Sequence, residues 1–206
     1  MLGGKPLLAW TIKMAKKCKL RTIVSSDSDK YLQLAKRMGC DTLKRPEHLA
    51  GDDTSMYEVL KSEVKRIHPY PDVVVLMQPT TPFRAKEDVE GAIKALADRA
   101  SVTSVITMEE VPEKYNPEQV FITVGERPTL VNGQAMFHRE TCRQKFQKAY
   151  VPTGSVYVFR AKNLDDGNIY GSEPRVYVTR PNININTIED FRLAEEYLKK
   201  YDGEGN

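Results

Sequence analysis

The 206-residue sequence is poor in cysteine and histidine, and neither residue forms a cluster. Its three cysteines, Cys18, Cys40 and Cys142, are scattered along the chain, and its three histidines are equally far apart. Isolated cysteines of this kind indicate free thiols in a reducing, cytoplasmic compartment rather than a disulfide framework. Without metal-ligand spacing, a zinc site or a histidine-based catalytic triad has little support.

The sequence also lacks long apolar runs and a large excess of one charge. No stretch approaches membrane-spanning length and no signal peptide is recognisable, so we expect no membrane partner. The 31 basic and 28 acidic residues leave a net charge of +3, which does not predict binding to nucleic acid. The length suits one large α/β domain, or one domain with an appendage.

The most informative stretch is VVVLMQPTTPFR, residues 73–84. Residues 73–77 are an unbroken run of strand formers, which is typical of a strand covered on both faces in a parallel sheet. Pro79 and Pro82 then stiffen the loop that follows. This loop carries four hydrogen-bonding side chains: Gln78, Thr80, Thr81 and Arg84. Because open α/β sheets bind ligands at the carboxyl ends of strands, the loop is a candidate ligand floor. A plain strand cap before a helix is the alternative.

Up to residue 108 the predicted strands and helices alternate. Strands are predicted at 21–25, 41–44, 73–77 and 104–108, and helices begin near residues 6, 29, 55 and 86. This alternation predicts a parallel sheet with right-handed crossovers. Later strands are predicted at 120–124, 155–159, 176–179 and 182–186, with a final helix over 187–201. In the 182–186 strand, alternating Asn and Ile give one polar face.

Residues 109–150 interrupt this pattern, because they are charged and irregular, with a hairpin-type turn signal at 132–133. A segment of this length inside a compact domain is usually a functional lid or an interaction arm. The sequence is therefore divided into a main domain, residues 1–108 and 151–206, and an arm, residues 109–150.

Six stretches carry a family resemblance: GGKPLLAWTI, IVSSD, RPEHLAGDDTS, LMQPTTPFR, RQKFQKAYVPTGSVYVF and NININTIEDF. Their order and spacing resemble the acylneuraminate cytidylyltransferases, the CMP-sialic acid synthetases and their relatives. The resemblance implies an α/β fold, a three-layer Rossmann-like nucleotidyltransferase with a mainly parallel sheet. It also implies a homodimer in which the 109–150 arm crosses to the partner and completes its site.

The activity that the resemblance implies is a nucleotidyl transfer that requires Mg²⁺. The anomeric hydroxyl of an acidic nine-carbon sugar (sialic, legionaminic or pseudaminic acid) attacks the α-phosphorus of CTP, and pyrophosphate leaves. Both substrates are anions, so catalysis needs in-line positioning and neutralised charge. The alternatives are another sugar nucleotidyltransferase, such as a Kdo cytidylyltransferase, or an inactive paralogue that serves as a binding subunit.

The resemblance assigns four side chains to the sugar pocket. Gln78 matches a sugar-binding glutamine, although a strand-end amide can also bond to local backbone. Arg143 matches an arginine of the substrate-carboxylate site and would otherwise be interpreted as solvated surface. Tyr157 matches a pocket tyrosine, a position compatible with core packing. Tyr170 falls near an aromatic position of the pocket.

Other matching residues have structural interpretations of equal weight. Thr80 and Thr81 belong to the same loop as Gln78, and Arg84 is expected to stabilise that loop rather than touch substrate. Thr54 and Ser55 fall in the nucleotide-binding loop of the family, but helix capping explains them equally well. The same holds for the strand-following carboxylate of Asp27.

Two departures from the family pattern concern charge and hydrogen bonding. The metal-binding Asp-x-Asp of the family is here Asn184-Ile185-Asn186, which offers carbonyl oxygens without charge, so Mg²⁺ affinity should fall. The alternative is that these asparagines are only the polar face of an edge strand, with the nearby Asp190 capping a helix. Thr153 and Gly154 match an Asn-Gly pair, and the change to Thr removes an amide.

A third departure concerns the beginning of the sequence. The family's first strand and its phosphate-wrapping loop would precede Met1. We therefore expect a gap between neighbouring strands, with unpaired backbone groups. We hypothesise that the natural reading frame starts upstream, or that Met1 is a misassigned start.

Overall fold

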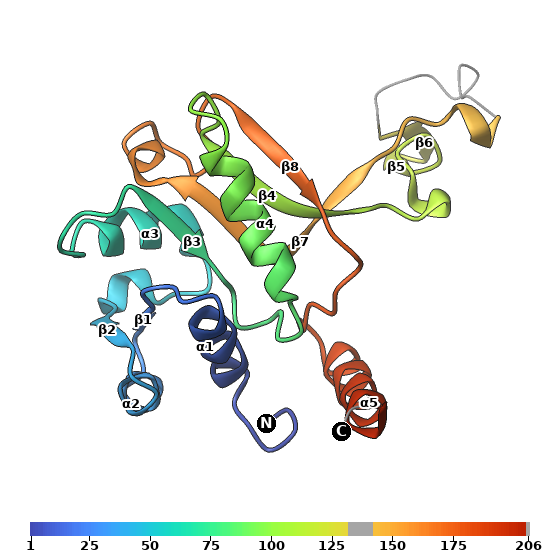
Figure 1. Ribbon diagram of the computed structural model, residues 1–206. Helices are drawn as coiled ribbons and strands as arrows, with labels where there is room; N and C mark the ends of the chain where they lie inside the picture. The colour runs from blue at the N-terminus through green and yellow to red at the C-terminus, as the bar shows by residue number, and fades with distance from the viewer. Residues whose placement is uncertain (132–141, 205–206) are drawn as a thin grey trace.

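Two separate β-sheets form the centre of the main domain in the computed structural model, which describes residues 1–131 and 142–204 (Figure 1). In the smaller sheet, β1 (Ile23–Ser26) pairs with β2 (Asp41–Lys44) in parallel. The larger sheet has the order β3 (Val73–Leu76), β7 (Tyr150–Arg160), β4 (Ser104–Glu110) and β8 (Pro174–Val178). Strands β4 and β8 are parallel, whereas β7 runs antiparallel to both of its neighbours.

Helices cover both faces of the larger sheet. Helix α4 (Lys86–Ala97) buries Val89, Ala92 and Leu96, at the spacing of one helical face, against Val156 and Val158 of β7. Helix α3 (Met56–Val64) packs instead with Phe159, which the alternation of strand side chains places on the opposite face. The result is a three-layer α/β arrangement, as predicted.

The remaining helices flank the sheets at the sides. Helix α1 (Leu7–Lys17) contributes Ile12 to a cluster with β1 and with α2 (Asp29–Arg37). Helix α5 (Ile188–Glu204) buries Ala194 with Leu2 and Ile185. The two ends of the chain therefore lie close together (Figure 1).

The sequence predicted the type and approximate place of most elements, with two differences in the sheet. Strand β7 is antiparallel and lies between β3 and β4, which the alternating pattern did not foretell. Residues 182–186 have no regular secondary structure and are not the predicted strand, because their backbone groups bond elsewhere. The N–H of Asn182 donates to the Glu109 carboxylate at 3.2 Å, and that of Ile185 donates to the Thr80 carbonyl at 2.7 Å.

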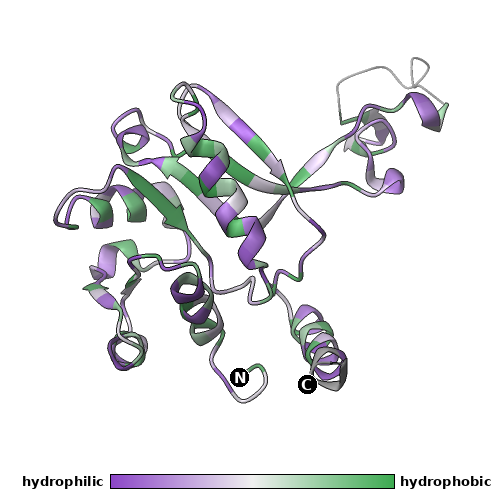
Figure 2. Ribbon diagram, in the orientation of Figure 1, coloured by the Kyte–Doolittle hydropathy of each residue, from purple (hydrophilic) through white to green (hydrophobic). Residues whose placement is uncertain are grey.

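The expected gap lies between β1 and β3. Within the described residues these strands do not pair with each other, so each leaves one edge open. Strand β3 is hydrophobic along its length (Figure 2) and packs side chains into clusters on both of its faces. Nevertheless Val73 is 36% exposed and the rest of β3 is only half-buried. Side chains of β3 pack on both faces, as predicted, but among the described residues β3 pairs only with the antiparallel β7 and not within a parallel sheet.

The arm grows out of the larger sheet and projects away from the main domain (Figure 1). Its stem is the continued pairing of β4 with β7, as far as Glu110 opposite Tyr150. Beyond the stem, β5 (Phe121–Val124) and β6 (Arg127–Leu130) form an antiparallel hairpin. The predicted strand at 120–124 is confirmed. The predicted turn at 132–133 lies outside the described residues.

Candidate active site

The loop after β3, residues 78–84, is bonded to two other segments, and we call it the shelf. The hydroxyl of Thr81 donates to the Gly154 carbonyl at 3.2 Å, and Nε of Arg84 donates to the Ser155 carbonyl at 3.0 Å. On its other side, the Thr80 carbonyl accepts the N–H of Ile185 at 2.7 Å. The shelf, the middle of β7 and the 182–186 segment are therefore held together at one end of the sheet.

Two amide side chains meet above Gly154. A Cβ atom built on Gly154 would lie 3.0 Å from Nδ2 of Asn184 and 3.5 Å from Oε1 of Gln78. The Oδ1 atom of Asn184 is buried and has no hydrogen-bond partner among the described residues. A buried acceptor without a partner is rare in native structures. The structure thus brings together Gln78 and Asn184, which are 106 positions apart in the sequence.

A bulge in β7 places Gly154 at this point. The pairing of β4 with β7 shifts between Ile106, opposite Tyr157, and Met108, opposite Pro152. The Thr107 hydroxyl bridges the break, because it accepts the N–H of Val156 at 2.9 Å and lies 3.0 Å from the Thr153 hydroxyl. Thr153 is buried and also donates to the Thr107 carbonyl. The Thr153 side chain therefore supports the bulge.

Arg84 lies beneath the shelf and is 1% exposed. Besides its bond to Ser155, it donates through Nη1 to the Thr11 hydroxyl at 3.0 Å and through Nη2 to the Gln78 carbonyl at 2.5 Å. Burial lowers the pKa of its guanidinium to about 10. Its contacts are those of the loop-stabilising residue that the sequence indicated.

Tyr157 lies on β7, opposite Leu76 of β3. The tyrosine is half-buried, and burial, followed by the nearby Tyr170, raises the pKa of its phenol. The Tyr170 ring is exposed, while its carbonyl accepts the Ser104 hydroxyl at 2.7 Å. The two predicted pocket tyrosines are therefore neighbours.

Arg143 is not part of this group. It begins a short 3-10 turn, residues 143–145, on the arm, and that turn lies far from the shelf of the same chain (Figure 1).

Thr54 and Ser55 lie at the start of α3. The Ser55 hydroxyl accepts the N–H of Glu58 at 3.2 Å, and the Glu58 carboxylate accepts the N–H of Ser55 at 3.2 Å. This reciprocal pair is a capping box, so helix capping accounts for Ser55.

Asn186 is exposed, unlike Asn184. Its backbone N–H and that of Thr187 donate to Oδ2 of Asp190, at 3.0 Å and 2.9 Å. These bonds hold the pKa of the Asp190 carboxyl below its ordinary value. Asp190 is therefore engaged in capping α5, as the sequence suggested.

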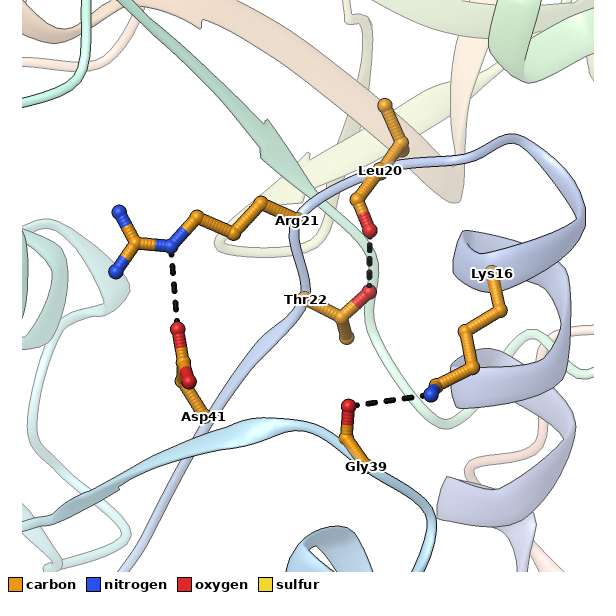
Figure 3. Close-up of a pocket in the computed structure, with 6 residues that line it drawn as sticks. All are labelled: Lys16, Leu20, Arg21, Thr22, Gly39 and Asp41. Atoms are coloured by element: carbon orange, nitrogen blue, oxygen red, sulfur yellow. Dashed lines mark hydrogen bonds and ion pairs between the residues drawn. The ribbon is translucent and has the colours of Figure 1, made fainter.

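Two hollows lie beside the described elements. The first, of about 230 Å³, lies next to the starts of β1 and β2 (Figure 3). In it Arg21 pairs with Asp41 at 3.1 Å, and Lys16 donates to the Gly39 carbonyl at 3.1 Å. Because these groups bond to one another, we assign it no ligand. The other, of about 430 Å³, is lined by Phe83, Asp88, Arg180, Asn182, Ile183 and Tyr197, among others. It adjoins the shelf, and the sequence pattern did not identify its lining.

The residues present do not fit a magnesium ion held by the protein alone. Asn184 and Asn186 are neutral, and Asp190 is engaged by backbone donors. Within residues 1–131 and 142–204, no three His, Cys, Asp or Glu side chains lie close enough to hold a metal. Mg²⁺ prefers anionic oxygens, and this site offers carbonyl oxygens only.

Comparison with known proteins gives a consistent family signal. The family model described as "Cytidylyltransferase" matches residues 1–198. The N-acylneuraminate cytidylyltransferase of Escherichia coli O18:K1:H7 is 28% identical over 199 residues, which cover 94% of this chain and 46% of that protein. The CMP-N,N'-diacetyllegionaminic acid synthase of Legionella pneumophila is 26% identical, over 97% of this chain and 88% of its own length.

The chain spans about half the length of the Escherichia coli relative and most of the Legionella relative. Among solved structures, a CMP:2-keto-3-deoxy-manno-octonic acid synthetase complexed with CTP superposes with a TM-score of 0.73 at 13% identity, over 98% of this chain and 90% of that one. A 4-diphosphocytidyl-2C-methyl-D-erythritol synthase from Anaerococcus prevotii gives a TM-score of 0.68 at 18% identity, over 97% and 88%. These structures confirm the Rossmann-like nucleotidyltransferase fold.

Proposed function

This chain belongs to the cytidylyltransferase family, and we propose that it activates an acidic nine-carbon sugar with CTP. The sugar's anomeric oxygen forms a bond to the α-phosphorus, the bond to the β-phosphate oxygen breaks, and pyrophosphate leaves. The hydroxyl proton passes to solvent. The sugar class follows the relatives named for N-acylneuraminate, legionaminic acid and pseudaminic acid.

The meeting of Gln78 and Asn184 over Gly154 is the observation that best supports this proposal. A sugar presents many hydroxyls, which donate and accept hydrogen bonds. The Gln78 amide can do both in return, and Nδ2 of Asn184 beside it can donate. The bonds of Arg84 to the Gln78 carbonyl and of the Ile185 N–H to the Thr80 carbonyl fix the backbone near these amides before substrate arrives, which is the preorganisation that a transfer reaction needs.

Magnesium enters this proposal with the nucleotide. Since Asn184 and Asn186 do not fit a protein-held ion, we assign the expected Mg²⁺ requirement to the CTP triphosphate. A bound Mg²⁺ would supply positive charge to the departing pyrophosphate. In this proposal Asn184 forms hydrogen bonds with the sugar and does not bind the metal.

We further propose a homodimer in which Arg143 of the partner subunit completes the site. The distance between the arm turn and the shelf of one chain supports this, because Arg143 can serve a shelf only in trans. The exposed Ile122 and Val124 of the arm hairpin offer apolar contact surface for a second chain. The three free thiols support a cytoplasmic location.

A substrate panel tests the reaction. Pyrophosphate release is measured with CTP, UTP, ATP and GTP against N-acetylneuraminate, legionaminate, pseudaminate and the eight-carbon acid Kdo. Release that requires CTP and a nine-carbon acid supports the proposal. Release with Kdo alone would assign the chain to the Kdo type, to which one curated relative and the CTP-bound neighbour belong. No release with any pair would favour an inactive binding subunit.

Mixing two inactive variants tests the shared site. Gln78→Ala removes the shelf amide and Arg143→Ala removes the arm cation, so each pure variant should be slow. In a mixed dimer one shelf keeps Gln78 and receives Arg143 from the other chain. Random mixing should therefore restore about a quarter of the wild-type activity, because half of the dimers regain one of their two sites. No restoration, or a monomer in sedimentation at micromolar concentration, would contradict the shared site.

A further inference from the structure

Arg84 is a buried cation whose bonding partners are all neutral. Its guanidinium donates to the Thr11 hydroxyl and to the carbonyls of Ser155 and Gln78. Among the described residues no carboxylate pairs with it, and burial alone displaces its pKa. The charge at this depth is therefore hydrogen-bonded but not neutralised.

Such an arrangement is costly for the folded protein by itself. A buried charge is normally paired with an opposite charge or shifted toward its neutral form. Arg84 keeps its proton at neutral pH, since its pKa is about 10. Its bond to the Gln78 carbonyl holds this charge next to the residue whose side chain reaches Gly154, and an anion bound there would offset it. Asn184 is neutral and therefore does not compensate the charge of Arg84. An aspartate at position 184 would provide a negative charge within the protein itself.

We propose that Arg84 is a positioning residue that favours the carboxylate of the sugar at the shelf. It acts through Gln78, whose carbonyl it holds from below, and it does not touch the substrate. The three bonds of its planar fork also link α1, the shelf and β7, so that the field and the geometry of the site come from one side chain. This inference rests on the proposed function and adds a residue to it.

The affinities of the full chain for N-acetylneuraminate and for its methyl ester are measured by calorimetry. Their comparison separates the effect of the ligand's charge from that of its shape. The wild-type protein should bind the acid more tightly than the uncharged ester. At an effective dielectric constant near 20, a unit charge about 8 Å away corresponds to roughly a 30-fold preference. Because Arg143 matches the substrate-carboxylate position, the comparison is made in an Arg143→Ala background. There Arg84→Met should abolish most of the remaining preference, whereas Arg84→Lys should retain part of it, because the charge remains and the fork is lost.

Thr11→Val is the matched control. It removes one of the three Arg84 bonds on the side away from the shelf and keeps the charge. Its melting temperature should fall, while its preference for acid over ester should stay within about twofold of wild type. If Arg84→Met does not fold, Arg84→Gln replaces it, because the amide can still donate to the Ser155 carbonyl.

Each outcome decides one of the two proposals. An Arg84→Met or Arg84→Gln protein that keeps the acid preference in the Arg143→Ala background, or a wild-type protein without one, overturns the role of Arg84. A wild-type protein that prefers the acid but releases no pyrophosphate with any nucleotide overturns the proposed reaction and leaves the role of Arg84 standing.

Discussion

Gly154→Ala is the substitution that tests the candidate site most directly. Gly154 has a φ of +67°, a conformation that L-residues adopt at a cost of roughly 1–2 kcal/mol. Alanine also restricts the unfolded chain, which returns about 0.4–1 kcal/mol. The backbone effect alone should therefore lower the free energy of unfolding by about 1 kcal/mol.

The added methyl group has a second effect, which falls on the site. It would lie 3.0 Å from Nδ2 of Asn184, so that the amide must shift by a few tenths of an ångström. The Gln78 Oε1 atom, at 3.5 Å, would be in ordinary contact. Because misplacement by about 1 Å can cost roughly a hundredfold in rate, we expect kcat/KM to fall about tenfold.

Gly167→Ala separates the two effects. Gly167 has a φ of +89°, and no atom lies within 4 Å of the Cβ position. Urea unfolding should show a similar loss of stability in both variants, while pyrophosphate release with CTP and the acidic sugar should fall only in Gly154→Ala. Equal kcat/KM values for Gly154→Ala and the wild-type protein would refute the placement of Asn184 and Gln78 in the site.

Three further variants test roles that the geometry distinguishes. Ser55→Ala should lower the free energy of unfolding by about 1 kcal/mol through loss of the helix cap, and a raised KM for CTP would instead reveal a nucleotide contact. The pKa of Asp190 is lowered in the folded state. The stabilisation that its carboxylate provides is therefore present above the unfolded pKa and is lost as the pH falls through the folded pKa. The free energy of unfolding should drop below about pH 4 in the wild-type protein, and this drop should be smaller in Asp190→Asn. Replacing Asn184 and Asn186 together by Asp should lower the Mg²⁺ concentration that gives half-maximal pyrophosphate release, and an unchanged midpoint would show that the metal does not lie near this pair.

Local patterns were sufficient to predict most of the fold. The helix predicted from near residue 86 and the helix capping predicted at Ser55 depend on neighbours a few residues apart, and both are confirmed. The antiparallel β7 could not be predicted in this way. Its place between β3 and β4 depends on the arm stem, in which Glu110 meets Tyr150 across forty residues of sequence. The prediction of a strand at 182–186 is wrong, because backbone N–H groups of this segment donate to the Thr80 carbonyl and the Glu109 carboxylate. The periodicity of the sequence does not reveal these partners.

The site has the same division between local and long-range information. The prolines and polar residues of the shelf marked it as a candidate from the sequence, yet nothing local indicated that Asn184 would lie over Gly154. That meeting requires the β7 bulge, which in turn requires the Thr107 hydroxyl to replace a missing backbone partner. The hydroxyl of Thr153 also bonds within the bulge. Thr153 thus supports the backbone that presents Gly154, above which the amides of Gln78 and Asn184 lie.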